Sequence, residues 1–285
     1  MKAYYLLPAL ALTLLAASCD KEAPQDSGPL PMRIEATLVE ESTKASLETD
    51  DLEDFYLQVR TDDPEFNYFT QVARSLGYWT SSVDLFWKSA TASTDFCAAR
   101  FGDHAFTADE FANGVDLAVP SGQRTQSQFE SADLLSSAMT TVKYEDCTGG
   151  RLPVALRHAL AKVSILIKVQ ETPENANISY IQESFKECTL KDVRTGFHFQ
   201  PTSGAVSALD APRGDISARK GECAFAAVSG EKARASYEAI LVPQTFASGG
   251  LLIYFAIGSD IYTWTNTTEI TLAAGKNYDL TLDLD

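Results

Sequence analysis

Leu251-Leu-Ile-Tyr-Phe-Ala-Ile-Gly-Ser-Asp-Ile-Tyr-Thr-Trp264 is the stretch that decides the fold class of this 285-residue chain. It contains two runs of β-branched and aromatic residues, 251–257 and 261–264, separated by the turn residues Gly258-Ser-Asp260. Such runs are typical of strands, and a short glycine-containing turn between them is typical of a β-hairpin. The stretch therefore predicts two neighbouring antiparallel strands.

Similar short runs occur along the whole chain, separated by turn residues. Strands are expected at 33–39, 54–60, 77–87, 114–120, 161–169, 178–185, 188–193, 196–199, 237–243 and 278–284. The central apolar run of 161–169 predicts a well-buried strand. A short helix is expected at 131–138, where Ser or Asp can serve as its cap. Many short strands with few helices predict an all-β sandwich or barrel.

The paired glycines Gly149-Gly150 mark the expected division between two domains, with a tolerance of several residues, because paired glycines interrupt regular structure. The length of the chain also fits two domains. We therefore expect an N-terminal β-sandwich domain over 33–150 and a C-terminal one over 151–285.

The first nineteen residues predict export. Lys2 precedes an apolar run that is too short to span a bilayer, and small residues lead directly to Cys19. Leu15-Ala-Ala-Ser-Cys19 resembles a bacterial lipobox, whose cysteine becomes acylated and opens the mature protein. We expect a signal peptide at 1–18 and a lipidated polar tether at 19–32 that holds the chain on the outer membrane. An ordinary cleaved signal is the alternative.

Four further cysteines, Cys97, Cys147, Cys188 and Cys223, lie in this exported chain, where disulfides are permitted. Four cysteines allow three connectivities. One pair per half, Cys97 with Cys147 and Cys188 with Cys223, is the simplest, and four buried thiols are the alternative. The absence of a C-x-x-C sequence argues against a zinc or thioredoxin-like site.

The composition and the motifs argue against several function classes. A net charge of −16 makes a nucleic-acid partner improbable, because phosphate binding needs clustered Lys and Arg. The three histidines, His104, His158 and His198, show no metal-ligand spacing, and His158 is interpreted as a strand-end residue with a satisfied hydrogen bond. The chain contains no G-x-S-x-G, P-loop or dinucleotide motif. We predict no enzyme activity, no cofactor and no metal; a hydrolase with an unrecognised site stays an alternative.

Two short motifs have simple interpretations. The acidic run at 50–54 lacks the alternating ligands and central glycine of a calcium loop, so it is interpreted as a solvated turn. Arg213-Gly214-Asp215 matches the integrin-binding tripeptide and is expected in an exposed loop. Three-residue matches arise easily by chance, and this one is treated as a coincidence.

Four parts of the chain together resemble the fimbrillin-like lipoproteins, a family that includes major and minor pilins. They are the lipobox with its tether, the segment 131–138, the strand 156–167, and the C-terminal pair 237–244 and 273–282. The resemblance implies two tandem transthyretin-like β-sandwiches, no cofactor, and a role in adhesion or pilus assembly.

The resemblance also implies donor-strand exchange with other pilus subunits. In such pilins a protease cuts after a basic residue beyond the first strand, and a strand from another subunit fills the groove that opens. Here the first strand is 33–39, and Lys44 is the basic residue in the loop that follows. An ordinary exposed lysine is the alternative for Lys44.

A departure from the family concerns the C-terminus. Many polymerising members continue past the last strand with a donor segment, whereas this sequence ends at Asp285, directly after 278–284. The resemblance therefore predicts a minor, anchoring or terminal subunit, or a stand-alone surface lipoprotein, with a host or bacterial surface ligand.

Carbohydrate binding by a surface lipoprotein of a glycan-uptake system is the alternative function. The pairs Tyr78-Trp79, Phe86-Trp87 and Tyr262 with Trp264 could stack on sugars. Aromatic residues in sandwich strands also serve as core or cross-strand pairs.

Overall fold

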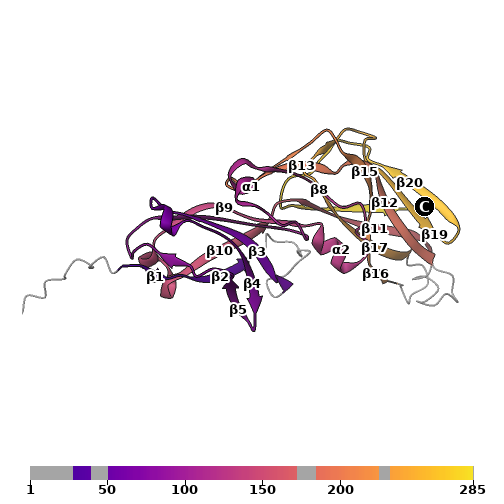
Figure 1. Cartoon of the computed structure of the whole chain (residues 1–285). Coiled ribbons are helices and arrows are strands. Elements are labelled where there is room, and N and C mark those ends of the chain that lie inside the picture. The colour runs from indigo at the N-terminus through magenta and orange to yellow at the C-terminus, as the bar shows by residue number, and fades with distance from the viewer. Residues whose placement is uncertain (1–27, 40–50, 172–183, 225–231, 285) are drawn as a thin grey trace, which may run out of the picture.

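The computed structural model describes residues 28–39, 51–171, 184–224 and 232–284. The chain consists mainly of β-strands and forms two lobes, one from its first half and one mainly from its second half (Figure 1). The predicted all-β fold is confirmed. None of the helices within the described ranges has the length and apolar composition needed to span a membrane.

The first lobe is built on one seven-stranded sheet. In spatial order its strands are β2 (Arg33–Leu38), β10 (Arg151–His158), β9 (Leu134–Val142), β7 (Thr94–Phe101), β3 (Asp54–Arg60), β4 (Tyr68–Ser75) and β5 (Tyr78–Ser81). The pair β2 and β10 is parallel and all the other neighbours are antiparallel. A two-stranded sheet of β1 (Leu30–Pro31) and β6 (Phe86–Trp87) lies beside it.

The second lobe contains two four-stranded sheets that share one hydrophobic core. The first has the order β16 (Arg219–Ala224), β17 (Lys232–Leu241), β11 (Ala161–Glu171) and β22 (Asn277–Asp283). The second has the order β15 (Arg213–Ser217), β12 (Phe185–Arg194), β19 (Leu252–Ile257) and β20 (Asp260–Thr265). The predicted hairpin of 251–264 is confirmed by β19 and β20, which pair antiparallel from Leu252 opposite Thr265 to Ile257 opposite Asp260.

Two smaller sheets complete the second lobe. One consists of β14 (Ala205–Ala208), β13 (Gly196–Gln200) and β8 (Val115–Ala118), and the other of β18 (Thr245–Phe246) and β21 (Ile270–Thr271). Strand β8 comes from the first half of the sequence, so the chain crosses into the second lobe and returns. A division of the chain into two consecutive domains therefore assigns β8 to the wrong lobe.

The expected boundary after residue 150 differs from the sheet topology. Strand β10, Arg151–His158, pairs with β2 and β9 in the first lobe, and the next strand, Ala161–Glu171, begins the second lobe. The glycines at 149 and 150 form a turn inside the first lobe, where the Trp87 Nε1 donates a hydrogen bond to the Gly150 carbonyl at 3.0 Å. Ala159 and Leu160 connect β10 of the first lobe to the first strand of the second lobe.

The helix expected at 131–138 is wrong. The structure places an α-helix, α2, at Gln126–Ser131, and the following residues form β9. The adjacent residues Leu134 and Leu135 are both fully buried, in two different hydrophobic clusters. The first part of this strand, residues 134–137, is buried on both faces, so its apolar residues do not alternate and its pattern resembles that of a helix.

The segment that contains α2 fastens the two lobes together. Phe129 of α2 is fully buried, with the Arg219 guanidinium 4.9 Å and the Lys162 ammonium 5.8 Å from the centre of its ring. Glu238 of β17 forms ion pairs with both cations, at 2.6 Å to Lys162. Thr125 begins the helix with a capping box. A short helix from the first half thereby covers the first sheet of the second lobe.

Candidate functional site

The two edges of the seven-stranded sheet approach each other in the first lobe. The edge strands β2 and β5 come within 8 Å of each other, measured between Cα atoms. A groove of about 850 Å³ lies along this seam. Figure 1 shows β2, β4 and β5 on the same side of the first lobe. We name this cavity the edge groove.

The edge groove has an apolar floor and a polar rim. Met32 and Leu85 line it and belong to the hydrophobic cluster of the first lobe, and the half-buried Ile34 and Trp79 line it and pack against that cluster. The alternate residues of β2 and β5 point outward, because successive side chains of a strand face opposite sides. The exposed rim consists of Arg33, Glu35, Tyr78, Thr80, Asp84 and Arg151. Such a groove can hold a ligand with both apolar and polar faces.

Strand β2 is held in the sheet along one side only. It pairs with β10 in parallel, from Arg33 opposite Arg151 to Leu38 opposite Leu156. Ala36 and Leu38 are buried in the cluster below, and backbone hydrogen bonds of 2.8 Å flank the strand, from Met32 to Leu85 and from Val39 to Leu156. The other side of β2 faces the edge groove.

The arginines Arg33 and Arg151 lie side by side on the groove rim. They are direct neighbours in the parallel pair, and both side chains are exposed. The Arg151 guanidinium is 4.0 Å from the Glu35 carboxylate. Within the described residues, the Arg33 guanidinium has no ion-pair partner. Like charges placed directly opposite each other are unfavourable, so this pairing destabilises the edge unless an anion lies nearby.

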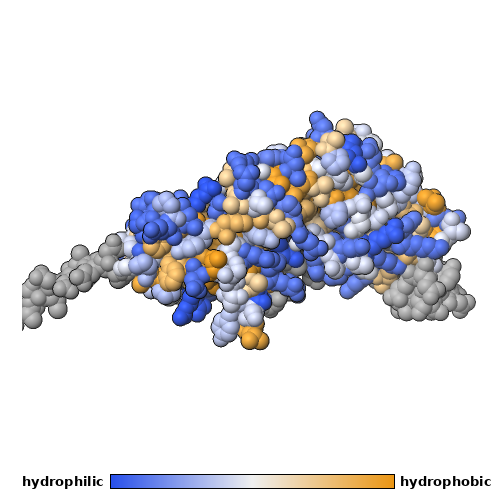
Figure 2. All heavy atoms as spheres, in the orientation of Figure 1, coloured by the Kyte–Doolittle hydropathy of each residue, from blue (hydrophilic) through white to orange (hydrophobic). Residues whose placement is uncertain are grey.

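The β4–β5 hairpin next to the groove projects from the lobe and carries exposed apolar side chains. Leu76 is 95% exposed and Tyr78 is 75% exposed. Leu76 and Gly77 occupy the turn with φ of +51° and +83°. Figure 2 shows this projection ending in hydrophobic atoms. The stretch from Ser75 to Val83 contains no charged residue.

Two residues singled out by the sequence lie outside the described residues. They are the expected lipidation site, Cys19, and the expected processing site, Lys44. Lys44 falls between Val39, directly after β2, and Asp51, shortly before β3. Both stay predictions.

All four remaining cysteines are free thiols in the structure, and neither expected disulfide pair is formed. Cys97 lies in the cluster between the lobes, whereas Cys147 packs against the cluster on the other side of the sheet. Cys188 and Cys223 belong to the two different sheets of the second lobe.

Burial makes two of these thiols poor nucleophiles. It raises the pKa of Cys97 to about 11 and that of Cys188 to about 12. A thiol reacts as its thiolate, so both groups are chemically inert near neutral pH. The alternative of four buried thiols holds for this pair, whereas Cys147 and Cys223 are half-buried.

Each histidine contacts one carboxylate. His158 at the end of β10 lies 2.5 Å from Asp133, which confirms its interpretation as a strand-end residue with a hydrogen bond. His198 lies 2.7 Å from Asp116, its cross-strand neighbour. His104 lies 3.3 Å from Glu110 in the short helix α1 (Ala108–Asn113). The three sites are separate. The described ranges contain no group of three or more metal-ligating side chains.

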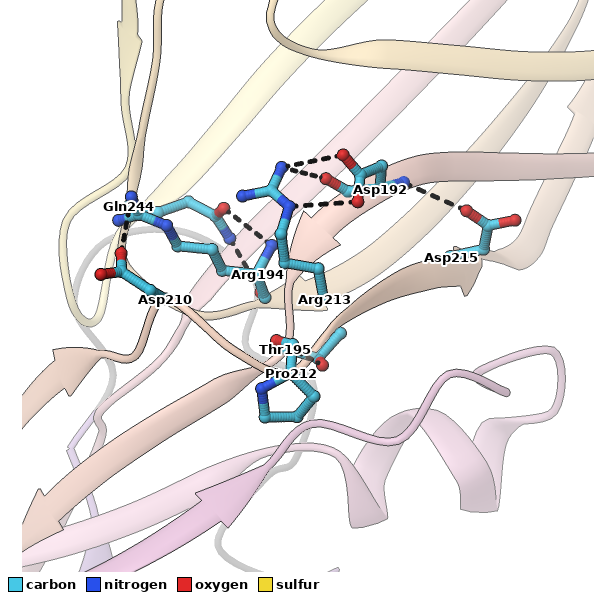
Figure 3. A network of polar contacts seen from close by, with 8 residues as sticks. All are labelled: Asp192, Arg194, Thr195, Asp210, Pro212, Arg213, Asp215 and Gln244. Atoms are coloured by element: carbon cyan, nitrogen blue, oxygen red, sulfur yellow. Dashed lines mark hydrogen bonds and ion pairs between the residues drawn. The ribbon is translucent and has the colours of Figure 1, made fainter.

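The tripeptide Arg213-Gly214-Asp215 lies in β15, not in a loop (Figure 3). Arg213 binds the carboxylate of Asp192 through two nitrogens, at 3.0 and 3.2 Å. Asp215 forms an ion pair with Lys191 and accepts a hydrogen bond from the Asp192 amide at 3.1 Å. The Lys191 ammonium holds the pKa of Asp215 below its usual range. The tripeptide therefore joins β15 to β12, and both of its charged side chains form ion pairs within this sheet.

The predicted sugar-stacking pairs separate into core and groove residues. Trp87 is fully buried, and the ring of Tyr262 stacks on Phe255 with 5.5 Å between centres. Tyr78, Trp79 and Phe86 line the edge groove. Two of the three pairs thus contribute a side chain to one cavity, and the Tyr262 and Trp264 pair does not.

The acidic run at 50–54 leads into strand β3. Asp51 and Glu53 are exposed, and Asp54 begins β3, where its carboxylate accepts hydrogen bonds from Gln71 at 2.7 Å and Arg100 at 3.3 Å. Asp50 lies outside the described residues.

Sequence reasoning missed the rim of the edge groove. Arg33 and Arg151 are 118 positions apart, and only the parallel pairing of their strands brings them together. The uncharged stretch from Ser75 to Val83 was visible in the sequence, but it does not reveal which strand faces it.

Comparisons with known proteins agree with this architecture. No curated protein sequence matches the chain. Crystal structures of three proposed cell adhesion proteins are similar over nearly their whole length. The one from Bacteroides ovatus has a TM-score of 0.61 and 16% identity, with 89% of this chain and 92% of that chain covered. The one from Bacteroides uniformis has a TM-score of 0.59 and 15% identity, with 90% and 93% covered. The one from Bacteroides thetaiotaomicron has a TM-score of 0.50 and 11% identity, with 89% and 93% covered.

At these identities the structural likeness shows the fold alone. The sequence model of one family, described as fimbrillin-like, matches residues 41–285 and so includes most of both lobes. The resemblance first noted in the lipobox and the strand patterns is thereby confirmed, and the chain belongs to the fimbrillin-like family.

Proposed function

We propose that this protein is a surface-exposed outer-membrane lipoprotein that acts as a pilus or adhesion component and assembles by exchange of β2. Membership of the fimbrillin-like family supports the general role in pili or adhesion. The observation that carries the specific mechanism is the position of β2, an edge strand paired with a single parallel neighbour.

Removal of β2 would leave a site that fits another strand. The unpaired edge of β10 would offer backbone hydrogen bonds, and the places of Ala36 and Leu38 would become apolar pockets. An extended strand with apolar residues at alternate positions can satisfy both, which is the basis of β-strand addition. Processing near Lys44 would separate β2 from the rest of the lobe, and Cys19 would carry the lipid anchor.

The position of the subunit is proposed to be minor, anchoring or terminal. The last described strand, β22, pairs with β11 in its own lobe, and its Leu282 is buried. It is therefore engaged within its own sheet. Long homopolymeric fibres formed by the protein expressed alone would contradict this part of the proposal.

The direct test is strand replacement in a protein cut within 40–50. A site-specific protease sequence is placed in that loop, the chain is cut, and a labelled synthetic peptide of residues 33–39 is added in excess. We expect stable uptake of the peptide. The matched control peptide carries Asp at positions 34, 36 and 38, and it should not be retained because these side chains face the core. Equal retention of both peptides, or of neither, would contradict strand exchange.

The native processing state is tested separately. Intact-mass and N-terminal analysis of membrane-bound and shed protein from its own cells should identify an acylated Cys19 in the anchored form. A shorter species beginning after Lys44 is expected if exchange occurs in the cell. Finding only the acylated full-length form there would contradict processing.

The second candidate function is glycan binding, and the edge groove favours it. Its volume lies in the range of ligand sites, and Tyr78, Trp79 and Phe86 can pack on the apolar face of a sugar ring. Glycan binding that is lost in Tyr78→Ala, with the fold retained, would support this function. Unchanged binding in that variant would exclude the edge groove as the site.

A further inference from the structure

We propose that the edge groove binds an acidic oligosaccharide, one that carries carboxylate or sulfate groups, while β2 is in place. This inference rests on the second candidate function, glycan binding, and adds the chemical class of the ligand. It also assigns roles to Arg33 and Arg151, which neither strand exchange nor the fold requires.

The charge of the groove lining is the first argument. Two arginines, Arg33 and Arg151, and two carboxylates, Glu35 and Asp84, line it. Three other cavities in the described ranges each contain one arginine and at least two carboxylates. In a chain with a net charge of −16, the edge groove is therefore, among these four cavities of the described residues, the one from which an anion is repelled least.

The arrangement of the arginines is the second argument. Arg33 and Arg151 are neighbours across two strands, and their only described carboxylate contact is the 4.0 Å approach of Glu35 to Arg151. Each guanidinium group carries parallel N–H donors that match a carboxylate or a sulfate, and this rim places two such groups on neighbouring strands. An anion between them would also remove the repulsion between the arginines themselves.

The width of the seam is the third argument, and it distinguishes a sugar from a peptide. A strand inserted between β2 and β5 needs about 9.6 Å between its neighbours, because adjacent strands lie about 4.8 Å apart. The Cα atoms of β2 and β5 come within 8 Å of each other, which is too close for that insertion. A peptide strand could enter only after β2 has left, whereas a chain of sugar rings can lie along the intact groove.

The aromatic side chains supply the remaining contacts. Tyr78 is 75% exposed at the rim, and Trp79 lies on the floor, with its ring edge-to-face on Phe55 at 5.2 Å between centres. The contact with Phe55 fixes the orientation of Trp79 without ligand. A sugar ring that packs on Tyr78 at the rim would bury apolar surface while its hydroxyl groups reach Glu35, Thr80 and Asp84.

The experiment uses the mature chain on an array of uronate-containing, sialylated and sulfated oligosaccharides, each printed beside its neutral parent. The variants are Arg33→Gln, Arg151→Gln and Tyr78→Ala. The matched control is Arg124→Gln, which alters an arginine that is also exposed but lies outside the groove. Titration calorimetry then measures the affinity for the best acidic glycan and its neutral parent. All four side chains are exposed, so the fold should be retained, and circular dichroism checks this.

The expected result is binding to acidic members that is at least about tenfold tighter than to their neutral parents, because each charge-assisted hydrogen bond contributes that much or more. Arg33→Gln and Arg151→Gln should each remove most of this preference. Tyr78→Ala should weaken binding to both acidic and neutral forms, and Arg124→Gln should change neither.

Other results would overturn the inference in distinguishable ways. Equal binding of acidic and neutral forms, or a preference that survives in both arginine variants, would overturn the acidic ligand and leave glycan binding standing. No binding to any glycan would overturn the inference together with glycan binding, while the peptide-replacement experiment would still decide strand exchange. Capture of the 33–39 peptide by the uncut protein, with β2 in place, would show that the groove takes a strand instead.

Discussion

The side chain of Gln123 pairs with both backbone polar groups of Ile240. Its Nε2 donates to the Ile240 carbonyl at 2.9 Å, and its Oε1 accepts from the Ile240 amide at 2.7 Å. Gln123 is fully buried and comes from the first half of the chain, whereas Ile240 belongs to β17 of the second lobe. Strand β16 begins at Arg219, opposite Glu238 of β17, and therefore does not reach Ile240. The side chain of Gln123 takes the place of a strand there and pairs with the backbone of β17.

Replacing Gln123 with Leu should lower the free energy of unfolding by about 2–4 kcal/mol, because two buried backbone groups lose their partner. Urea unfolding followed by circular dichroism measures this change. The control is Ser127→Ala, an exposed position that should stay within about 0.5 kcal/mol. We also expect one cooperative transition for both lobes, since they share buried hydrogen bonds. Two well-separated unfolding transitions in the unaltered protein would contradict the expectation that the two lobes unfold together.

Acid should weaken the contact of α2 with the second lobe through Glu238. Burial alone would raise the pKa of this carboxyl, but the ion pairs with Lys162 and Arg219 outweigh it and lower the pKa below 4.5. A lowered folded-state pKa contributes stability that is complete above the unfolded value, near 4.5, and is lost as the pH falls through the folded value.

Glu238→Gln should therefore lower the free energy of unfolding by about 1–3 kcal/mol at pH 7, the range for hydrogen bonds to charged groups. The difference from the unaltered protein should shrink as the pH falls below about 4.5, where the unfolded chain becomes protonated, and through the lowered pKa of the folded state. Urea unfolding at pH 7, 5 and 3.5 measures both proteins. A difference that is constant over this range would contradict a role for the charge of Glu238.

Thiol labelling should separate the four cysteines into two classes. Cys97 and Cys188 are buried and have pKa values raised to about 11 and about 12, so iodoacetamide at pH 8 should leave them unmodified in the native protein. The half-buried Cys147 and Cys223 should react faster. Peptide mass spectrometry measures the extent at each site. After unfolding without reductant all four should react, and any site that then needs reductant would show that a disulfide forms.

Replacing Leu76 with Asn should stabilise the β4–β5 hairpin by about 0.5–1 kcal/mol. Leu76 has a φ of +51°, a conformation that is unfavourable for a side chain of this kind and better tolerated by Asn. The melting temperature measures the gain. Val83→Asn is the matched control, since it removes another exposed apolar side chain, 44% exposed, from a residue without a positive φ. An equal gain in both variants would attribute the effect to lost apolar surface instead of backbone conformation.

The sequence predicted the strands in which burial alternates or in which a clear turn intervenes. Residues 54–60 were predicted as a strand and are β3, because the apolar residues Phe55, Leu57 and Val59 alternate along it and face the hydrophobic cluster of the first lobe. The hairpin at Gly258 was found for the same reason, since its turn residues stand between two uninterrupted apolar runs.

Prediction failed where the surroundings of a strand override its pattern. Thr94–Phe101, β7, was missed because both of its faces are buried, one by each hydrophobic cluster, so its apolar residues do not alternate. The same environment made β9 resemble a helix. The local sequence of a strand predicts neither its partner strand nor the curvature of its sheet. The edge groove depends on both, because it lies between the two edge strands of one curved sheet.

The parallel pairing of β2 with β10 has a mechanical consequence. Strand β2 begins beside β1, at the end of the first lobe that lies away from the second lobe, whereas β10 leads through Ala159 and Leu160 into the second lobe (Figure 1). A pulling force between the proposed membrane anchor ahead of β1 and a partner bound to the second lobe would act along both strands in opposite directions. All the hydrogen bonds from Arg33 to Leu38 would then be sheared together, not broken one after another. The strand that we propose to be exchanged is thus placed to resist tension.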